Sequence, residues 1–256
     1  MLSKSEMYIT NYISRIFKTF IYSLPAIKSL HKNLDNQFER DEFVINQLKT
    51  LPNQSKILDA GCGSQRYRQY CDHLVYSAQD FGQYTTDIKR MVGSEGIGGQ
   101  EGYQYGKLDY VGDIWDVDEA DAVFDAILCT EVFEHIPYSN ETIKEFSRLL
   151  KPNGTLILTA PSNCLRHMDP YFFYSGFSDR WYEKILTDSN LNIKLLHTVG
   201  DYYSWLAVEM FRTATAHSIF AAISLGPAFL YYYNKNKTIE SVNTLCMGYH
   251  IVATKN

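Results

Sequence analysis

A short apolar run that leads into a Gly-x-Gly turn, at residues 57–64, is the feature that most limits how this chain folds. Such a run predicts a buried strand, and the glycines behind it allow a tight turn where missing Cβ atoms let a ligand approach the backbone. A dinucleotide site needs a third glycine at position 66, where Arg66 stands, and no Gly-Lys-Ser/Thr follows to form a phosphate loop. The turn therefore fits a cofactor that lacks a pyrophosphate.

Similar apolar runs recur after Pro52, separated by turns and by helical patterns. This alternation is typical of a doubly wound, mostly parallel sheet whose two faces are covered by helices. A helix is expected at about 140–150. The expected strands lie at about 56–59, 74–80, 108–111, 124–129 and 155–159.

The two ends of the chain carry helical patterns. Apolar residues at helical spacing predict an amphipathic helix at about 5–24 and a second helix at about 35–50, so residues 1–52 are expected to form an N-terminal helical cap. Residues 53–256 then form the main domain, with a C-terminal helical insertion near 201–234 and a last strand within 244–253. Six glycines between residues 87 and 107 predict a mobile loop.

Charge and cysteine content narrow the class of protein. The net charge of -5 gives no global attraction for a polyanion, so nucleic acid is not an expected partner. Five cysteines without a C-x-x-C pair suit reduced thiols and a cytoplasmic location, and they offer no structural zinc site. The apolar stretch at 218–233 is shorter than the roughly 20 residues of a spanning helix.

Several segments resemble one known family. Asp59-Ala60-Gly61-Cys62-Gly63 resembles the first motif of the class I S-adenosylmethionine-dependent methyltransferases. Residues 124–136 are similar to the fourth-strand motif of that family, and residues 149–155 to the turn before the fifth strand. The resemblance implies a Rossmann-like methyltransferase fold with an antiparallel last strand, and S-adenosylmethionine (SAM) as the cofactor.

The same resemblance suggests how the cofactor is held. Asp80 ends the second expected strand, where a carboxylate can accept hydrogen bonds from both ribose hydroxyls. Asp59 and Gly61 are expected to hold the methionine moiety, and Asp113 the adenine. For Asp80 and Asp113 the competing interpretation is a helix cap or a surface position. For Asp59 and Gly61 it is an ordinary strand-to-helix turn. The full expected set is Asp59, Gly61, Cys62, Gly63, Asp80, Phe81, Asp113, Ile114 and Thr130.

The catalytic candidates are His135, His167 and Glu131. His135 and Glu131 follow the fourth expected strand, together with Glu134, and the neutral-range pKa of histidine makes His135 the preferred general base, unless it is only a structural histidine. His167 follows the fifth strand in a segment similar to a His-x-x-Pro-Tyr sequence of saccharide-pathway methyltransferases. A metal site from Glu131, His135 and Asp169 has no ligand spacing to support it, so no metal is expected.

These features predict methylation of a hydroxyl or amine on a small polar acceptor, such as a sugar, a nucleotide-sugar or a secondary metabolite. One alternative is a non-catalytic partner subunit with a methyltransferase fold. Another is a membrane-surface enzyme that methylates a lipid-linked acceptor, because the first helix carries Lys4, Arg15 and Lys18 on its polar face. The sequence gives no oligomeric state.

Overall fold

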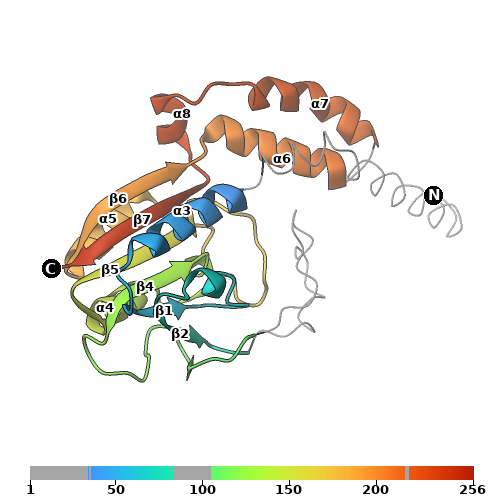
Figure 1. Cartoon of the computed structure of the whole chain (residues 1–256). Coiled ribbons are helices and arrows are strands. Elements are labelled where there is room, and N and C mark those ends of the chain that lie inside the picture. The colour runs from blue at the N-terminus through green and yellow to red at the C-terminus, as the bar shows by residue number, and fades with distance from the viewer. Residues whose placement is uncertain (1–33, 35, 84–104, 217–218) are drawn as a thin grey trace, which may run out of the picture. The chain divides into compact units, whose positions relative to one another are not determined.

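The computed structural model describes residues 34, 36–83, 105–216 and 219–256 (Figure 1). The helix expected at 5–24 and most of the glycine-rich segment at 87–107 lie outside these residues. The chain divides into a sheet unit, Glu39–Val199 with Leu245–Asn256, and a helical unit, Met1–Phe38 with Gly200–Thr244. Most of the helix expected at 35–50 therefore belongs to the sheet unit.

The sheet unit contains a seven-stranded sheet with the order β3-β2-β1-β4-β5-β7-β6. Neighbouring strands are parallel, except that β7 runs antiparallel to both β5 and β6. This order confirms the predicted doubly wound, mostly parallel Rossmann-like sheet with an antiparallel last strand. The strands are β1 (Lys56–Ala60), β2 (Val75–Asp80), β3 (Tyr110–Val111), β4 (Phe124–Thr130), β5 (Leu150–Pro161), β6 (Leu191–Val199) and β7 (Gly248–Lys255).

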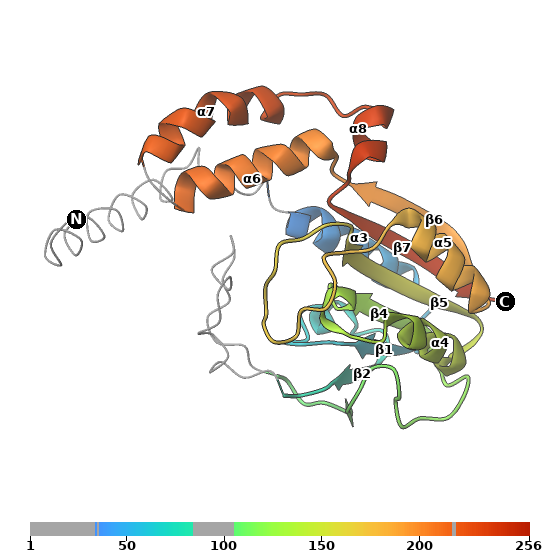
Figure 2. The ribbon, with the colours of Figure 1, turned by 180° about the vertical axis from the view of Figure 1, so that it is seen from behind.

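Helices cover both faces of this sheet, as Figure 1 and Figure 2 show from opposite sides. α3 lies on one face and buries Val44 and Leu48 against the central strands, whereas α4 and α5 lie on the other face and bury Phe146 and Tyr182. Because both faces are covered, β1 and β4 are nearly continuous apolar runs. The helices are α3 (Asn36–Thr50), α4 (Ser139–Leu149) and α5 (Asp179–Asp188).

The helical unit contains α6 (Tyr202–Ala216), α7 (Ile219–Tyr233) and α8 (Ile239–Thr244). Phe211 of α6 packs on Phe229 of α7, with ring centroids 5.8 Å apart. The carboxylate of Asp201, just before α6, accepts hydrogen bonds from the Ser204 amide (2.9 Å) and from the Ser241 hydroxyl on α8 (2.6 Å). None of the described helices is long and apolar enough to cross a membrane.

Three details differ from the expected elements. β5 begins at Leu150, five residues before the expected 155, so α4 leads straight into it. α5 and β6 lie before the helical insertion expected near 201–234, in a stretch where no strand was expected. β7 begins at Gly248, because residue 244 still belongs to α8.

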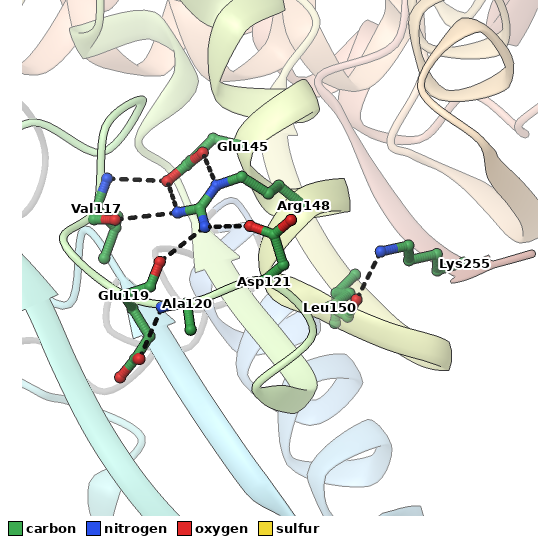
Figure 3. Close-up of polar contacts among 8 residues, drawn as sticks. All are labelled: Val117, Glu119, Ala120, Asp121, Glu145, Arg148, Leu150 and Lys255. Atoms are coloured by element: carbon green, nitrogen blue, oxygen red, sulfur yellow. Dashed lines mark hydrogen bonds and ion pairs between the residues drawn. The ribbon is translucent and has the colours of Figure 1, made fainter.

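Arg148 on α4 fixes the segment between β3 and β4 (Figure 3). Its guanidinium donates to both carboxylate oxygens of Glu145 at 2.8 and 2.7 Å. It also donates to the carbonyl oxygens of Val117 (3.0 Å) and Glu119 (2.7 Å), and to the carboxylate of Asp121 (2.8 Å). The chain that leaves β3 is thereby tied to α4.

Replacing Arg148 with methionine should lower the free energy of unfolding by about 2 to 3 kcal/mol, because the buried Glu145 loses its partner and two carbonyl oxygens lose donors. Urea unfolding followed by circular dichroism measures this loss. Arg180→Met is the matched control, since that exposed arginine pairs with Glu183 one turn away. Equal unfolding midpoints for the two variants would contradict the proposed clamp.

Candidate functional site

The site begins at the Gly-x-Gly turn that follows β1. The strand order reverses its direction here, between the neighbouring strands β1 and β4. Ligands bind at this edge in open α/β sheets. Gly61 and Gly63 both have left-handed backbone conformations, with φ of +68° and +51°. A Cβ atom on Gly61 would stand 2.5 Å from Cγ2 of Val132. The turn therefore needs glycine both for its backbone and for its contact with the segment after β4.

Replacing Gly61 with alanine should destabilise the fold by about 2 to 4 kcal/mol, from the left-handed backbone and the collision with the stiff Val132 side chain. Gly82→Ala is the matched control, because φ is +71° there but the nearest side-chain atoms lie 3.5 Å away. It should cost only about 1 kcal/mol. Thermal unfolding of both variants measures the difference, and adding Val132→Ala should recover part of the Gly61→Ala loss. Equal losses would show that crowding contributes nothing.

Asp80 ends β2 beside this turn and is buried. Its carboxylate accepts hydrogen bonds from the Gly63 amide (3.0 Å) and the Gly82 amide (3.2 Å). Burial raises the pKa of Asp80, and these two amides together with the side chain of Tyr105 oppose the rise. A hydroxyl group, that of Tyr105, thus already reaches this carboxylate.

Asp59 lies on β1 and is also buried. Burial raises its pKa to about 7, although a hydrogen bond from the Tyr76 hydroxyl, 2.5 Å from Oδ2, opposes the rise. Gln79, which precedes Asp80 on β2 and pairs with Ala60 of β1, was not singled out in the sequence. Its side-chain oxygen accepts from the Gly61 amide (3.1 Å), and its Nε2 donates to the Gly112 carbonyl (2.8 Å). Gln79 therefore holds the turn after β1 to the segment after β3.

The remaining candidate cofactor residues differ in their burial and in what they contact. Ile114 is buried in the core, whereas the neighbouring Asp113 is exposed. Thr130 ends β4 next to Thr159 of β5. The Phe81 ring packs edge-on against Tyr171, with centroids 4.9 Å apart. The Cys62 thiol is buried, and this burial raises its pKa, so it is no nucleophile.

The rings of His135 and His167 contact each other, and His135 also contacts Tyr171. The Nδ1 atom of His135, within the short helix η3 (Phe133–His135), lies 2.6 Å from the Tyr171 carbonyl oxygen. The Nδ1 atom of His167 lies 2.8 Å from the Leu165 carbonyl oxygen. The two rings stand edge to face with centroids 4.6 Å apart. These two histidines are far apart in the sequence, but the loop after β5 places His167 next to His135.

Glu134 completes this group from a buried position. Its Oε1 atom lies 3.7 Å from Nε2 of His135 and 4.0 Å from Nε2 of His167. Its Oε2 atom is buried, and no hydrogen-bond partner for it exists in the part of the chain that the structure describes. Burial, followed by the nearby charge of Glu131, raises the pKa of Glu134 to about 8. Burial lowers the pKa of His135, so its imidazole is neutral at pH 7.

Glu131 stands beside this group with both oxygens engaged. Its Oε1 accepts from the Thr159 hydroxyl (3.0 Å), and its Oε2 forms an ion pair with Arg40 of α3 (3.0 Å). Arg40 carried no signal in the sequence, because it lies on a helix far from the motifs. The pair fixes the left-handed turn at Glu131, where φ is +53°.

The two halves of the site are joined by direct contacts. Val132 packs against Gly61 of the turn, and Phe81, next to Asp80, packs against Tyr171. The Tyr171 carbonyl in turn receives the hydrogen bond from His135. The carboxylates at the ends of β1 and β2 therefore lie on the same edge as the group of Glu134, His135 and His167.

Comparison with known families agrees with this geometry. A methyltransferase domain family matches residues 58–158, and a second methyltransferase domain family matches residues 109–222. No curated protein sequence matches the chain. Together the two matches span the Gly-x-Gly turn, the strands of the sheet up to β6 and part of α7.

Solved structures of low identity share the fold. A geranyl diphosphate methyltransferase in complex with SAM has a TM-score of 0.54 at 14% identity, covering 93% of this chain and 95% of that one. A phosphoethanolamine N-methyltransferase from Haemonchus contortus, with SAM, has a TM-score of 0.52 at 15% identity, covering 85% and 52%. The [4+2]-cyclase SpnF has a TM-score of 0.50 at 16% identity, covering 84% and 80%. At such identities the likeness shows the fold alone.

The order of this sheet and its Gly-x-Gly turn after β1 agree with the Rossmann-like methyltransferase fold that the sequence resemblance implies. With the two family matches, the chain is a class I SAM-dependent methyltransferase. SAM is its cofactor, and the residues at the edge fit it: Asp80 offers a buried carboxylate that a hydroxyl already reaches, and the glycine turn lets a ligand approach the backbone.

Proposed function

We propose that this enzyme methylates a hydroxyl or amine of a small polar acceptor, such as a sugar, a nucleotide-sugar or a secondary metabolite. The observation that carries the proposal is the group of His135, His167 and Glu134 beside the cofactor edge. Two imidazoles and a buried carboxyl group suit an acceptor with polar, hydrogen-bonding substituents. An apolar acceptor would leave these groups without partners.

The proposed cofactor roles follow the edge of the sheet. Asp80 binds the ribose hydroxyls, because its carboxylate faces the turn and is fixed by two backbone amides. Asp59 and the backbone of Gly61, Cys62 and Gly63 hold the methionine end. The segment that Arg148 ties to α4 presents Asp113 and Ile114 to the adenine, with Phe81 and Thr130 completing the set.

The proposed acceptor end consists of His135, His167 and Glu131. SAM supplies a methyl group on a sulfonium, which an acceptor atom attacks in line, so the protein contributes chiefly by positioning. Each imidazole donates its Nδ1 hydrogen to a carbonyl oxygen, which leaves both Nε2 lone pairs for the acceptor side. Glu131, held by Arg40 and Thr159, keeps the turn that carries His135 in place.

A lipid-linked acceptor is the second candidate, and one feature of α7 favours it. This helix exposes Phe220, Ile223, Leu230 and Tyr231, each at least 58% accessible in the described part of the chain. Exposed apolar side chains of this density suit a membrane surface. Sedimentation with anionic liposomes tests this candidate, and Phe220→Ser/Ile223→Ser should then release the protein. A chain that stays in the supernatant rules it out.

Methyl transfer from labelled SAM to a panel of sugars, nucleotide-sugars, amines and phenolic metabolites tests the proposed function. We expect transfer to at least one polar class, and none to hydrocarbons without a hydroxyl or amine. SAM binding by calorimetry accompanies the assay. Binding of SAM without transfer to any acceptor would favour the non-catalytic partner subunit instead.

A further inference from the structure

One group of three side chains in the described residues brings its ligand atoms together closely enough for a metal ion: Glu134, His135 and His167, all within 4.8 Å of one another. No local ligand spacing predicts this group, because His167 comes from the loop after β5. Of the three conceivable ligands in the sequence, Glu131, His135 and Asp169, two have other partners in the structure. Asp169 is bound by Arg166 at 2.8 and 2.9 Å, and Glu131 is paired with Arg40.

Both histidines are held in the form that binds metals. Nδ1 of His135 and Nδ1 of His167 each face a backbone carbonyl oxygen, so each must carry its hydrogen there. The neutral ring then has its lone pair on Nε2, and both Nε2 atoms face Glu134. A histidine ligand whose second nitrogen donates to a carbonyl is the usual arrangement around protein-bound metals.

Glu134 supplies the acidic ligand, because its carboxyl group releases its proton when a cation binds. Its carboxyl group is 2% exposed, and Oε2 has no partner among the described residues. Leaving such a group unsatisfied is costly, and a bound cation would satisfy it. Ligands at about 2.1 Å from one ion stand about 3.0 to 3.4 Å apart. The observed 3.7 and 4.0 Å between Oε1 and the two Nε2 atoms need to close by only part of an ångström.

We propose that Glu134, His135 and His167 bind one divalent first-row transition cation, such as Mn²⁺ or Zn²⁺. Two imidazoles and one carboxylate favour these ions over Mg²⁺ and Ca²⁺, which prefer oxygen ligands alone. Three protein ligands leave coordination positions open for another molecule.

The role of this ion rests on the proposed function. An acceptor oxygen bound at an open position is oriented toward the cofactor edge, and the cation lowers the pKa of a hydroxyl that it binds. Glu131 and Arg40 form a neutral pair beside the site, so the net charge of the three ligands is set by Glu134.

Titration of the full chain with Mn²⁺ alone tests the site. The chain carries no histidine tag and is first stripped with a chelator. Free Mn²⁺ is followed by its electron paramagnetic resonance signal, with Zn²⁺ and Mg²⁺ titrated by calorimetry. We expect one ion per chain, with Mg²⁺ bound at least about ten-fold more weakly. Absence of saturable Mn²⁺ and Zn²⁺ binding would overturn the proposal.

Two ligand variants and one control make the test specific. His167→Ala should weaken Mn²⁺ binding by more than about ten-fold, since even loss of a group that only supports a ligand has that effect. Glu134→Gln should do the same. His197→Ala is the matched control, because that histidine pairs with Glu39 on the surface and should bind Mn²⁺ like the parent. Equal affinity in His167→Ala and His197→Ala would refute the site.

The outcomes for the ion and for the reaction are separable. Mn²⁺ binding without methylation of any acceptor leaves the metal site standing and removes the proposed function. Methylation by the stripped chain, without Mn²⁺ binding, removes the metal site alone. Unchanged SAM affinity and an unchanged circular dichroism spectrum in His167→Ala and Glu134→Gln exclude a folding defect.

Discussion

Replacing His135 with alanine should lower turnover by about 10²- to 10⁴-fold while SAM binds nearly as before. His135 lies at the proposed acceptor end. Its Nδ1 is hydrogen-bonded to the Tyr171 carbonyl, whereas its Nε2 faces Glu134. No contact joins its ring directly to Asp59 or Asp80 in the described chain. Steady-state methylation of the acceptor found in the panel, with calorimetry of SAM, measures the two effects separately.

A second variant separates the chemistry of the ring from its structural hydrogen bond. His135→Asn keeps an amide that can donate to the Tyr171 carbonyl but has no atom in place of Nε2. It should be as inactive as His135→Ala if Nε2 is required. Near-normal turnover in His135→Asn would reduce His135 to a structural histidine, which was the competing interpretation of the sequence.

His167→Ala shows how the acceptor end works. Losses of similar size in the His135 and His167 variants are expected if both rings hold one cation. A loss confined to one of them would instead identify that histidine as a single general base. Near-normal turnover in both variants would leave catalysis by positioning alone.

The central strands and the turn after β1 could be predicted because their signals are local. The apolar residues at 57–60 stand directly before two glycines, and this order alone dictates a buried strand and a tight turn. β6 (Leu191–Val199) escaped prediction because it is an edge strand with a bulge, so polar residues interrupt its apolar alternation. β5 is longer than predicted because Leu150 already pairs with Phe124 of β4. An irregular stretch with a left-handed Asn153 (φ +64°) follows, and regular pairing resumes at Thr155.

A candidate site residue could be predicted only where it directly follows or ends a recognisable strand. Asp80 follows from the end of β2, and His135 from the end of β4. The partners that fix them come from elsewhere: Arg40 lies on α3, and Gln79 acts through a side chain that bridges two loops. Such contacts depend on tertiary packing, which no spacing within a single segment encodes.

Replacing Asp80 with alanine should weaken SAM binding about 100-fold or more. A ribose with two hydroxyls would lose a charged acceptor, and each hydrogen bond to a charged group contributes roughly 1.5 to 3 kcal/mol. Asp80→Asn is the informative companion. It keeps the acceptor for only one of the two amides, because Gly63 donates to Oδ2 and Gly82 to Oδ1, and it removes the charge and the other acceptor position.

Calorimetry with SAM should therefore rank the parent above Asp80→Asn and Asp80→Asn above Asp80→Ala. Asp109→Asn serves as the control for a loss of negative charge nearby, since that carboxylate accepts from the Ala78 amide on β2, away from the turn after β1. Its affinity for SAM should match that of the parent. Asp80 accepts hydrogen bonds from the amides of Gly63 and Gly82, so its loss also removes a contact that holds Gly63. Thermal unfolding of each variant without ligand measures this loss of stability separately from the loss of SAM binding. An unchanged SAM affinity in Asp80→Ala would remove this residue from the ribose role and shift the cofactor toward Asp59 and the backbone of Gly61.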